Sequence, residues 1–331
     1  MKKWGVVVLM FVALNLPWSI ASVEAKMDNL ARLPGATLLM GYPPYNLVVT
    51  TGDTTSKLQT GGGDWYVTPS MSADGHLIAS ARADANAASS LRSRPKLTVS
   101  TYSMADQRWA DYKDLDVYDG SVAISPDGTK LACITRKVAG APSHLRILDL
   151  HTGAITAGPE SSDNAGPDLS WSPDGREIVF DREVARSADG KAIPSLRAIY
   201  VLNFAAGTVS KIADGMSPSW SPSGEWIAFY DYSPGRDDVK KGWYATNADR
   251  VSVVHPDGTG QRVLLTLQRD DSLKVSPVWS PDSKDVLLNK VRDEDKSTMD
   301  LYLLDIATQK LTKKFANVPP VYAWAVEKLA H

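Results

Sequence analysis

Four oxygen-bearing side chains are placed so that they could share one chemical task. Asp119, Asn164, Asp168 and Asp214 each lie a few residues ahead of a short apolar segment. Carboxylate and amide oxygens are the ligands that Ca²⁺ prefers in proteins, so their convergence would suit a hydrolase that uses a divalent cation. Asp and Asn are also common in loops because they form turns, and this second interpretation is the one we favour.

Sequence patterns for other kinds of catalysis are missing. The chain has no G-x-S-x-G and no H-E-x-x-H sequence, and its five histidines are scattered. Its single cysteine, Cys133, lies in an apolar segment, can form no intramolecular disulfide and is expected to be a small core residue. We therefore expect a protein that is not an enzyme and has no cofactor.

A four-residue turn sequence recurs five times and identifies the elements that position these side chains. The copies are SADG at Ser72, SPDG at Ser125 and Ser172, SPSG at Ser221 and SPDS at Ser280, at intervals of about 50 residues. Pro presets the backbone of such a turn, Asp accepts hydrogen bonds from nearby amides, and Gly adopts the left-handed conformation before the next strand. The last copy lacks the Gly, so we expect its turn to be slightly strained.

Each repeat contains four strand-like segments. In the last full copy they span residues 275–279, 285–290, 301–304 and 311–315. Four short antiparallel strands in about 50 residues form one blade of a β-propeller. A large residue before each turn alternates with small neighbours, which predicts a wedge between blades. These wedge residues are Met71, Ile124, Trp171, Trp220 and Trp279.

The two ends of the chain supply a sixth blade. Residues 37–41, 46–50 and 56–60 have the pattern of its last three strands, and residues 321–326 that of its first. We expect an all-β, six-bladed propeller over residues 37–331, its ring closed where the C-terminal strand joins the N-terminal strands. Closure of this kind removes the open sheet edges. Residues 26–36 are expected to be a short N-terminal tail.

The first 25 residues have the pattern of a secretory signal peptide. Lys2 and Lys3 precede an almost wholly apolar run, and Val23 and Ala25 occupy the −3 and −1 positions of a cleavage site. We expect cleavage after Ala25, a periplasmic or secreted protein, and no membrane span thereafter; an uncleaved membrane anchor is the alternative. The net charge of −2 gives no indication of nucleic-acid binding.

The repeat resembles the WD-like repeats of the TolB family. The resemblance is carried by W-S-P-D-G at residues 171–175, followed by an apolar strand, and by D-x-x-T-G at residues 149–153. It implies a periplasmic six-bladed propeller that binds proteins or peptides at one face, and in TolB itself the partner is an outer-membrane, peptidoglycan-associated lipoprotein. TolB carries an α/β domain ahead of its propeller, whereas only residues 26–36 precede the first strand here. Similar blades occur in prolyl-oligopeptidase-type enzymes.

Long connections between the second and third strands are expected to share one face of the propeller. They span residues 82–96, 136–143, 181–197, 231–250 and 290–297 and hold 17 Lys and Arg against 11 Asp and Glu. A basic face favours an acidic partner, although variable loops can also be merely tolerant of change. The candidate contact residues in these loops are Arg92, Arg94, Trp243 and Tyr244.

The mouth of the central channel is the other candidate site. The residues three positions before each wedge are small and mostly polar: Thr68, Ser121, Asp168, Ser217, Ser276 and Val321. The candidate contact residues at this mouth are Trp65, Tyr66, Tyr118, Asp119, Asp168, Asp214 and Lys274. Such a ring could hold a peptide end or an ion, or could simply hydrate the channel.

The function that these observations favour is binding. We expect an exported, monomeric, non-enzymatic propeller of a bacterial envelope that binds a protein or peptide. A lactonase-type hydrolase that depends on a divalent cation in the channel is one alternative, and a structural scaffold is the other.

Overall fold

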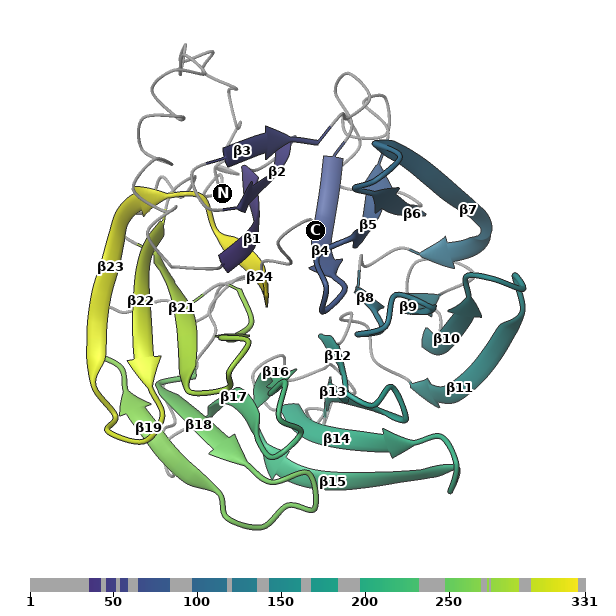
Figure 1. Ribbon diagram of the computed structural model, residues 1–331. Helices are drawn as coiled ribbons and strands as arrows, with labels where there is room; N and C mark the ends of the chain where they lie inside the picture. Colours follow the sequence, from purple (N-terminus) through teal and green to yellow (C-terminus); the bar gives the residue numbers. More distant parts are fainter. Residues whose placement is uncertain are drawn as a thin grey trace, which may run out of the picture.

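Six four-stranded antiparallel sheets are arranged in a ring, so the predicted all-β, six-bladed propeller is confirmed (Figure 1). The computed structural model describes residues 36–326, apart from residues 43–45, 52–53, 59–64, 84–96, 118–120, 136–142, 162–167, 184–196, 232–247, 269–272, 274 and 292–298. Within these ranges every regular element is a strand. The proposed signal peptide, residues 1–25, and residues 26–35 of the proposed tail lie outside them, whereas Ala36, the last residue of that tail, begins the first strand. No helix among the described residues is long and apolar enough to cross a membrane.

In each blade the strands are given in order from the propeller axis outward. Blade 1 consists of β24 (Val321–Val326), β1 (Ala36–Tyr42), β2 (Asn46–Thr51) and β3 (Thr54–Lys57). Blade 2 consists of β4 (Trp65–Met71), β5 (Leu77–Ala83), β6 (Leu97–Ser103) and β7 (Arg108–Val117). Blade 3 consists of β8 (Val122–Ile124), β9 (Lys130–Thr135), β10 (Ser143–Asp149) and β11 (Ile155–Ser161).

The second half of the ring repeats this order. Blade 4 consists of β12 (Leu169–Trp171), β13 (Glu177–Glu183), β14 (Arg197–Asn203) and β15 (Thr208–Asp214). Blade 5 consists of β16 (Met216–Trp220), β17 (Ile227–Asp231), β18 (Arg250–Val254) and β19 (Arg262–Thr266). Blade 6 consists of β20 (Val278–Trp279), β21 (Asp285–Val291), β22 (Met299–Asp305) and β23 (Leu311–Val318).

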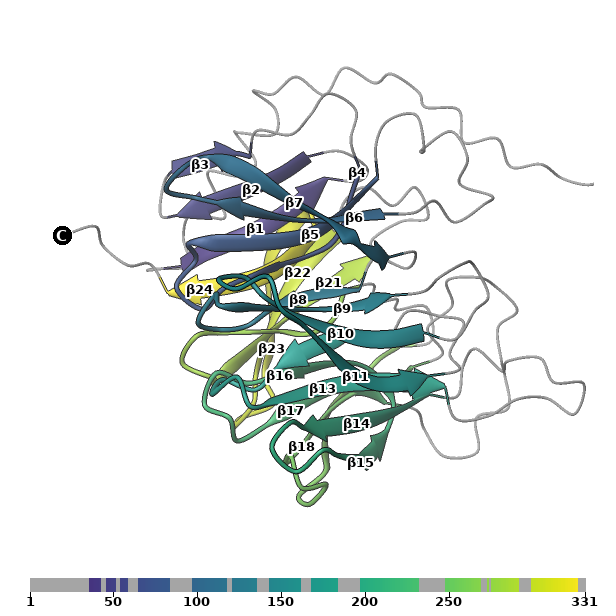
Figure 2. The same ribbon diagram turned by 90° about the vertical axis from the view of Figure 1, so that its right-hand side faces the viewer.

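The two faces of the ring differ in their connections. Each innermost strand begins at one face of the ring, here called the entry face. In blades 2 to 6 it ends in one of the five repeated turns, which lie at the opposite face, here called the turn face. The turns between third and fourth strands also lie on the turn face, at the left of the side view (Figure 2). Residues that begin an innermost strand therefore lie at the entry face.

The repeated turns form for the reason that their sequence suggests. The Ser172 hydroxyl donates to Asp174 Oδ1 at 2.6 Å and accepts from the Glu177 N–H at 2.9 Å, which joins the turn to the start of the next strand. Gly175 has φ of 68°, a conformation that glycine adopts without steric cost. In the copy without glycine, Ser283 takes φ of 60°. The predicted strain at that turn is confirmed, because residues other than glycine rarely adopt a positive φ.

The wedge residues pack between blades as predicted. Trp171, Trp220 and Trp279 are 5%, 7% and 4% exposed. The Trp171 indole N–H donates to the Ala123 carbonyl of the preceding blade at 3.0 Å, and Trp279 donates to Ser219 in the same way at 2.9 Å. Buried Trp normally finds such a partner, and these bonds tie successive blades together.

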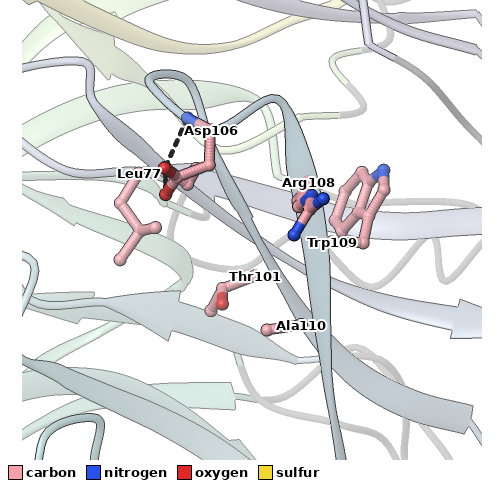
Figure 3. A pocket seen from close by; sticks show the side chains of 7 residues that line it. Leu77, Thr101, Asp106, Arg108, Trp109 and Ala110 are labelled. Carbon is pink, nitrogen blue, oxygen red and sulfur yellow. Dashed lines mark hydrogen bonds between the residues drawn. The ribbon is translucent and has the colours of Figure 1, made fainter.

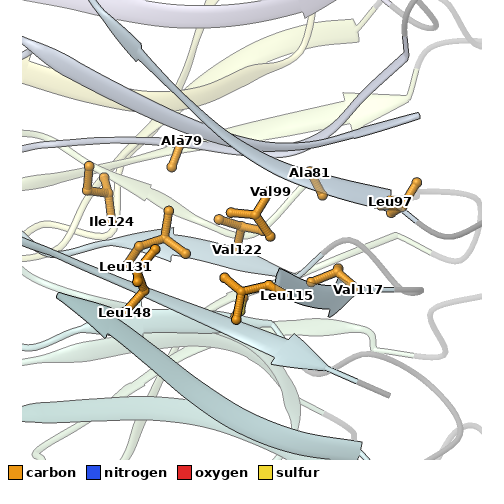
Figure 4. Packing of buried hydrophobic residues seen from close by; sticks show 11 residues of the cluster. Ala79, Ala81, Leu97, Val99, Leu115, Val117, Val122, Ile124, Leu131 and Leu148 are labelled. Carbon is orange, nitrogen blue, oxygen red and sulfur yellow. The ribbon is translucent and has the colours of Figure 1, made fainter. Parts of the chain in front are cut away.

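Apolar side chains fill the space between neighbouring blades. Between blades 2 and 3, Val99 and Ala81 face Val122 and Leu131, and all four are buried (Figure 4). Cys133 belongs to the same cluster, and burial raises the pKa of its thiol to about 12. It is therefore a core residue and not a thiolate nucleophile, as its apolar surroundings predict.

The ring closes between the two ends of the chain. β24 pairs antiparallel with β1, and Trp324 lies opposite Leu38 in the register. Leu38 and Val321 are almost fully buried against blade 6. The sheet edge that an open ring would expose on blade 1 is thus covered by the last strand of the chain.

Candidate axial binding site

A polar cluster lies where the innermost strands of three blades begin. Asp168 directly precedes β12 of blade 4, Ser217 lies in β16 of blade 5, and Ser276 precedes β20 of blade 6. The Ser276 hydroxyl donates to Asp168 Oδ2 at 3.3 Å, and the Ser217 side chain is a second hydrogen-bond partner of the same carboxylate. Three of the six residues predicted to ring the channel are thus brought together.

A buried ion pair supports this cluster from within blade 4. Arg197 donates to both carboxylate oxygens of Asp181, with Nε to Oδ2 at 2.9 Å and Nη2 to Oδ1 at 3.2 Å. Asp181 also accepts the backbone N–H groups of Asp168, at 2.8 Å, and of Ser217, at 3.1 Å. Asp181 and Arg197 are 2% and 6% exposed. The ion pair therefore holds the backbone in place at Asp168 and at Ser217.

The surroundings of Asp168 disfavour its negative charge. Burial and then the nearby negative charge of Asp181 raise the pKa of Asp168, and its hydrogen bonds with Ser217 and Ser276 offset this only in part. Tyr230 lies close by, and burial followed by the Asp168 charge raises the pKa of its phenol. Its hydroxyl donates to the Val275 carbonyl at 2.6 Å. Protonation of Asp168 is thus favoured relative to an exposed aspartate.

The same ring position in other blades shows unusual backbone conformations. Thr68 has φ of 44° and Ser217 has φ of 55°, although a side chain disfavours this region and a β-branched one does so most. The Thr68 Oγ1 is buried, and none of the described residues is a hydrogen-bond partner for it. In blade 1 the position is held by Val321, which is fully buried. The ring is therefore polar on some blades and apolar on another.

The structure does not bring together the four predicted cation ligands. Asp214 ends β15, the outermost strand of blade 4, where its side chain is 67% exposed and pairs with Lys211 at 2.6 Å. Asp119 and Asn164 lie outside the described residues. Where the chain is described, no group of three or more His, Cys, Asp and Glu side chains could hold a metal ion.

Most of the other predicted contact residues are not placed. Trp65 and Tyr66 begin β4, where their backbones pair with Ala83 and Arg82 at the entry face. The predicted contacts that lie outside the described residues are Arg92, Arg94, Tyr118, Asp119, Trp243, Tyr244 and Lys274.

Some of the charges counted on the long loops are neutralised inside the blades. Arg82 forms a salt bridge with Asp111 of the same blade, and Arg250 pairs with Asp231 at 2.9 Å. Together with Asp181–Arg197, these pairs were absent from the sequence-based interpretation. A carboxylate at the end of an apolar strand, as in residues 178–181 (IVFD), is the sequence signal that could have indicated such a buried pair.

A shallow groove of about 480 Å³ lies at the turn face of blade 2, away from both predicted sites (Figure 3). Leu77 and Thr101 contribute to its lining, together with Arg108. Asp106 accepts a hydrogen bond from the Ser103 hydroxyl at 2.8 Å, and this closes the hairpin at one end of the groove. The groove carries no paired catalytic groups.

Comparison with known proteins finds likeness in structure alone. No family model matches the chain, and no curated protein sequence matches it. The crystal structure of TolB from Acinetobacter baumannii superposes with a TM-score of 0.61 at 16% identity, over 88% of this chain and 66% of that one. A chain of the nidogen/laminin complex gives 0.59 at 10% identity, over 89% and 99%. Hydrazine synthase of Kuenenia stuttgartiensis gives 0.51 at 16% identity, over 83% and 78%.

These similarities concern the fold. The resemblance to TolB-like propellers is confirmed at that level, and the chain spans 66% of the TolB chain that it matches. Propellers of this architecture serve unrelated functions, so the fold does not assign one.

Proposed function

We propose that this chain is an exported, non-enzymatic propeller that binds a protein or peptide in the bacterial envelope. The observation that carries the proposal is the axial cluster, in which Asp168, Ser217 and Ser276 meet from three blades. A rigid ring that presents polar side chains from separate blades is suited to binding a ligand. The signal-like sequence of residues 1–25 and the TolB-like fold support its placement in the envelope.

The cluster is better suited to binding than to catalysis. Asp181, the second carboxylate, is held by Arg197 and by two backbone amides. Its role is therefore to stabilise the fold, and its oxygens are already occupied by these partners. A hydrolytic site needs a nucleophile or a metal-bound water beside its acid or base. The Asp168 carboxylate hydrogen-bonds with the Ser217 and Ser276 hydroxyls, and among the described residues no histidine is a hydrogen-bond partner in this cluster to complete a nucleophile triad.

The direct test is recovery of a partner from envelope extract. The full chain, with a C-terminal tag and its own N-terminal segment, would be used as bait, and bound proteins would be identified by mass spectrometry. We expect one specific protein, with an outer-membrane peptidoglycan-associated lipoprotein as the leading candidate. The same experiment determines whether residues 1–25 are removed. Failure to recover any protein reproducibly would contradict the proposal.

A matched pair of variants tests the entry face. Replacing Arg92 and Arg94 with Ser should weaken capture of an acidic partner and reduce its salt dependence. Replacing Arg176 with Ser is the control, because this side chain is 81% exposed on the turn face. Equal loss in both variants, or loss in neither, would exclude the entry-face loops as the binding surface.

A further inference from the structure

We infer that Asp168 anchors a primary ammonium group of the ligand at the entry-face end of the propeller axis. The inference rests on the proposed binding function and specifies the chemistry of the group bound. A lysine side chain and a free peptide amino terminus both carry this group.

The cluster contains two carboxylates and one described cation. Arg197 forms its salt bridge with Asp181, with both oxygens engaged. None of the described residues forms a salt bridge with Asp168, which is enclosed by three blades yet keeps part of its surface accessible. Carboxylates in such surroundings are normally paired with a cation. The accessible side of Asp168 is therefore a place where a cation of the ligand would be stabilised.

The surrounding oxygens favour an ammonium group over other cations. An ammonium has three donors and needs several acceptors around a compact charge, and the Asp168 carboxylate with the Ser217 and Ser276 hydroxyls provides them. A guanidinium prefers both oxygens of a free carboxylate in one plane, but Ser276 already occupies Oδ2. A divalent ion would need more charged oxygen ligands than the one carboxylate that is available.

Backbone strain at the ring is a second, independent feature. Thr68 and Ser217 hold the same ring position in blades 2 and 5, and both have positive φ. The buried Thr68 Oγ1 has no partner among the described residues. Strained residues of this kind persist where the surrounding structure requires them, and they gather at ligand-binding positions. Their presence in the ring around Asp168 agrees with a site built to hold a polar group.

Saturation-transfer NMR on the full chain provides the test, because it detects weak ligands. Three alanine-based tripeptide amides serve as probes: one with a free amino terminus, one acetylated and containing a central lysine, and one acetylated without lysine. We expect signal from the first two and none from the third, and the stronger of the two identifies the source of the ammonium. Asp168→Asn should weaken binding about tenfold or more, since the bond to a charged group is lost.

Control variants make each outcome decisive. Asp174→Asn makes the same change in a turn of the same blade and should leave binding intact. Ser276→Ala keeps the charge of Asp168 and should weaken binding several-fold, so the inference does not depend on one variant. Circular dichroism would confirm that each variant is folded.

Four results would overturn the inference. The first three are equal signal from the neutral peptide, unchanged binding by Asp168→Asn, and no signal from any probe. Binding seen only after Lys274→Met would show that the chain's own lysine occupies the site, and this too would overturn it. Recovery of a partner from envelope extract would still stand, so failure of the ammonium site can be distinguished from failure of the proposed function.

Discussion

The side chain of Asn289 forms two hydrogen bonds with the backbone of Val321. Its Nδ2 donates to the Val321 carbonyl at 2.9 Å, and its Oδ1 accepts from the Val321 N–H at 2.8 Å. Asn289 belongs to blade 6, and Val321 is the first residue of the strand that closes the ring. Asp181 likewise accepts the N–H of Ser217 in the next blade at 3.1 Å. At two places in the ring, therefore, a side chain of one blade is hydrogen-bonded to the backbone of the next.

Asn289→Ala should destabilise the protein by about 2–4 kcal/mol, because it leaves a buried N–H and a buried carbonyl without partners. The free energy of unfolding from urea titration measures this. Asn203→Ala is the control, with an expected cost of about 1 kcal/mol, since Asn203 is only half-buried at the end of β14. Similar values for the two variants would contradict a role for Asn289 in closing the ring.

Trp171→Phe should cost about 2 kcal/mol, since it removes the bond to the Ala123 carbonyl and part of the wedge volume. Trp226 is half-buried and stacks on His255 with ring centroids 3.9 Å apart. Trp226→Phe should cost less than about 1 kcal/mol. Thermal unfolding of both variants checks this order, and the reverse order would show that the wedge contributes little.

Gly215→Ala should cost about 3 kcal/mol or more. Gly215 has φ of 153°, and an added Cβ would lie 2.6 Å from the Tyr230 carbonyl oxygen and from the Phe229 ring. The matched control is Gly153→Ala, at φ of 73° with no atom within 4 Å of the added Cβ, which should cost about 1 kcal/mol. Equal losses in stability would mean that backbone conformation, and not close packing, determines the effect.

The stability of the wild type should fall relative to Asp168→Asn as pH rises above 4. The pKa of Asp168 is raised from its ordinary value of 3.8 by burial and by Asp181, with Arg197 acting in the opposite direction. The folded state therefore binds a proton more tightly than the unfolded state, so folding loses stability as pH rises through the raised pKa. Urea titrations of both proteins between pH 4 and 8 measure the difference. A constant difference would show that Asp168 is not perturbed in solution.

Removal of divalent cations should leave the melting temperature unchanged. Asp214 faces solvent beside Lys211, which takes one of the four predicted oxygen ligands out of the axial cluster. A bound ion that stabilised the fold would raise the melting temperature by mass action. Melting curves with and without a chelator, followed by added Ca²⁺, test this. A clear shift would restore the cation-dependent hydrolase as a candidate function.

The blade architecture could be predicted from the sequence because it is encoded locally. The turn around Ser172 and Asp174 depends on residues within five positions of one another. The alternation of large and small residues that identifies Trp171 as a wedge follows from the two-residue period of a strand. Repetition of these short-range signals was sufficient to give the number of blades and the closure of the ring.

The composition of the axial cluster was decided by tertiary structure. Asp168 and Ser276 are 108 positions apart, and only closure of the ring at a particular radius brings them into contact. Asp214 is predicted beside them, but it ends β15, the outermost strand of blade 4, where its side chain is 67% exposed beside Lys211. The sequence by itself thus determined the six blades and their packing, whereas the arrangement of charges at the axis depended on contacts between residues far apart in the chain and could be seen only in the folded protein.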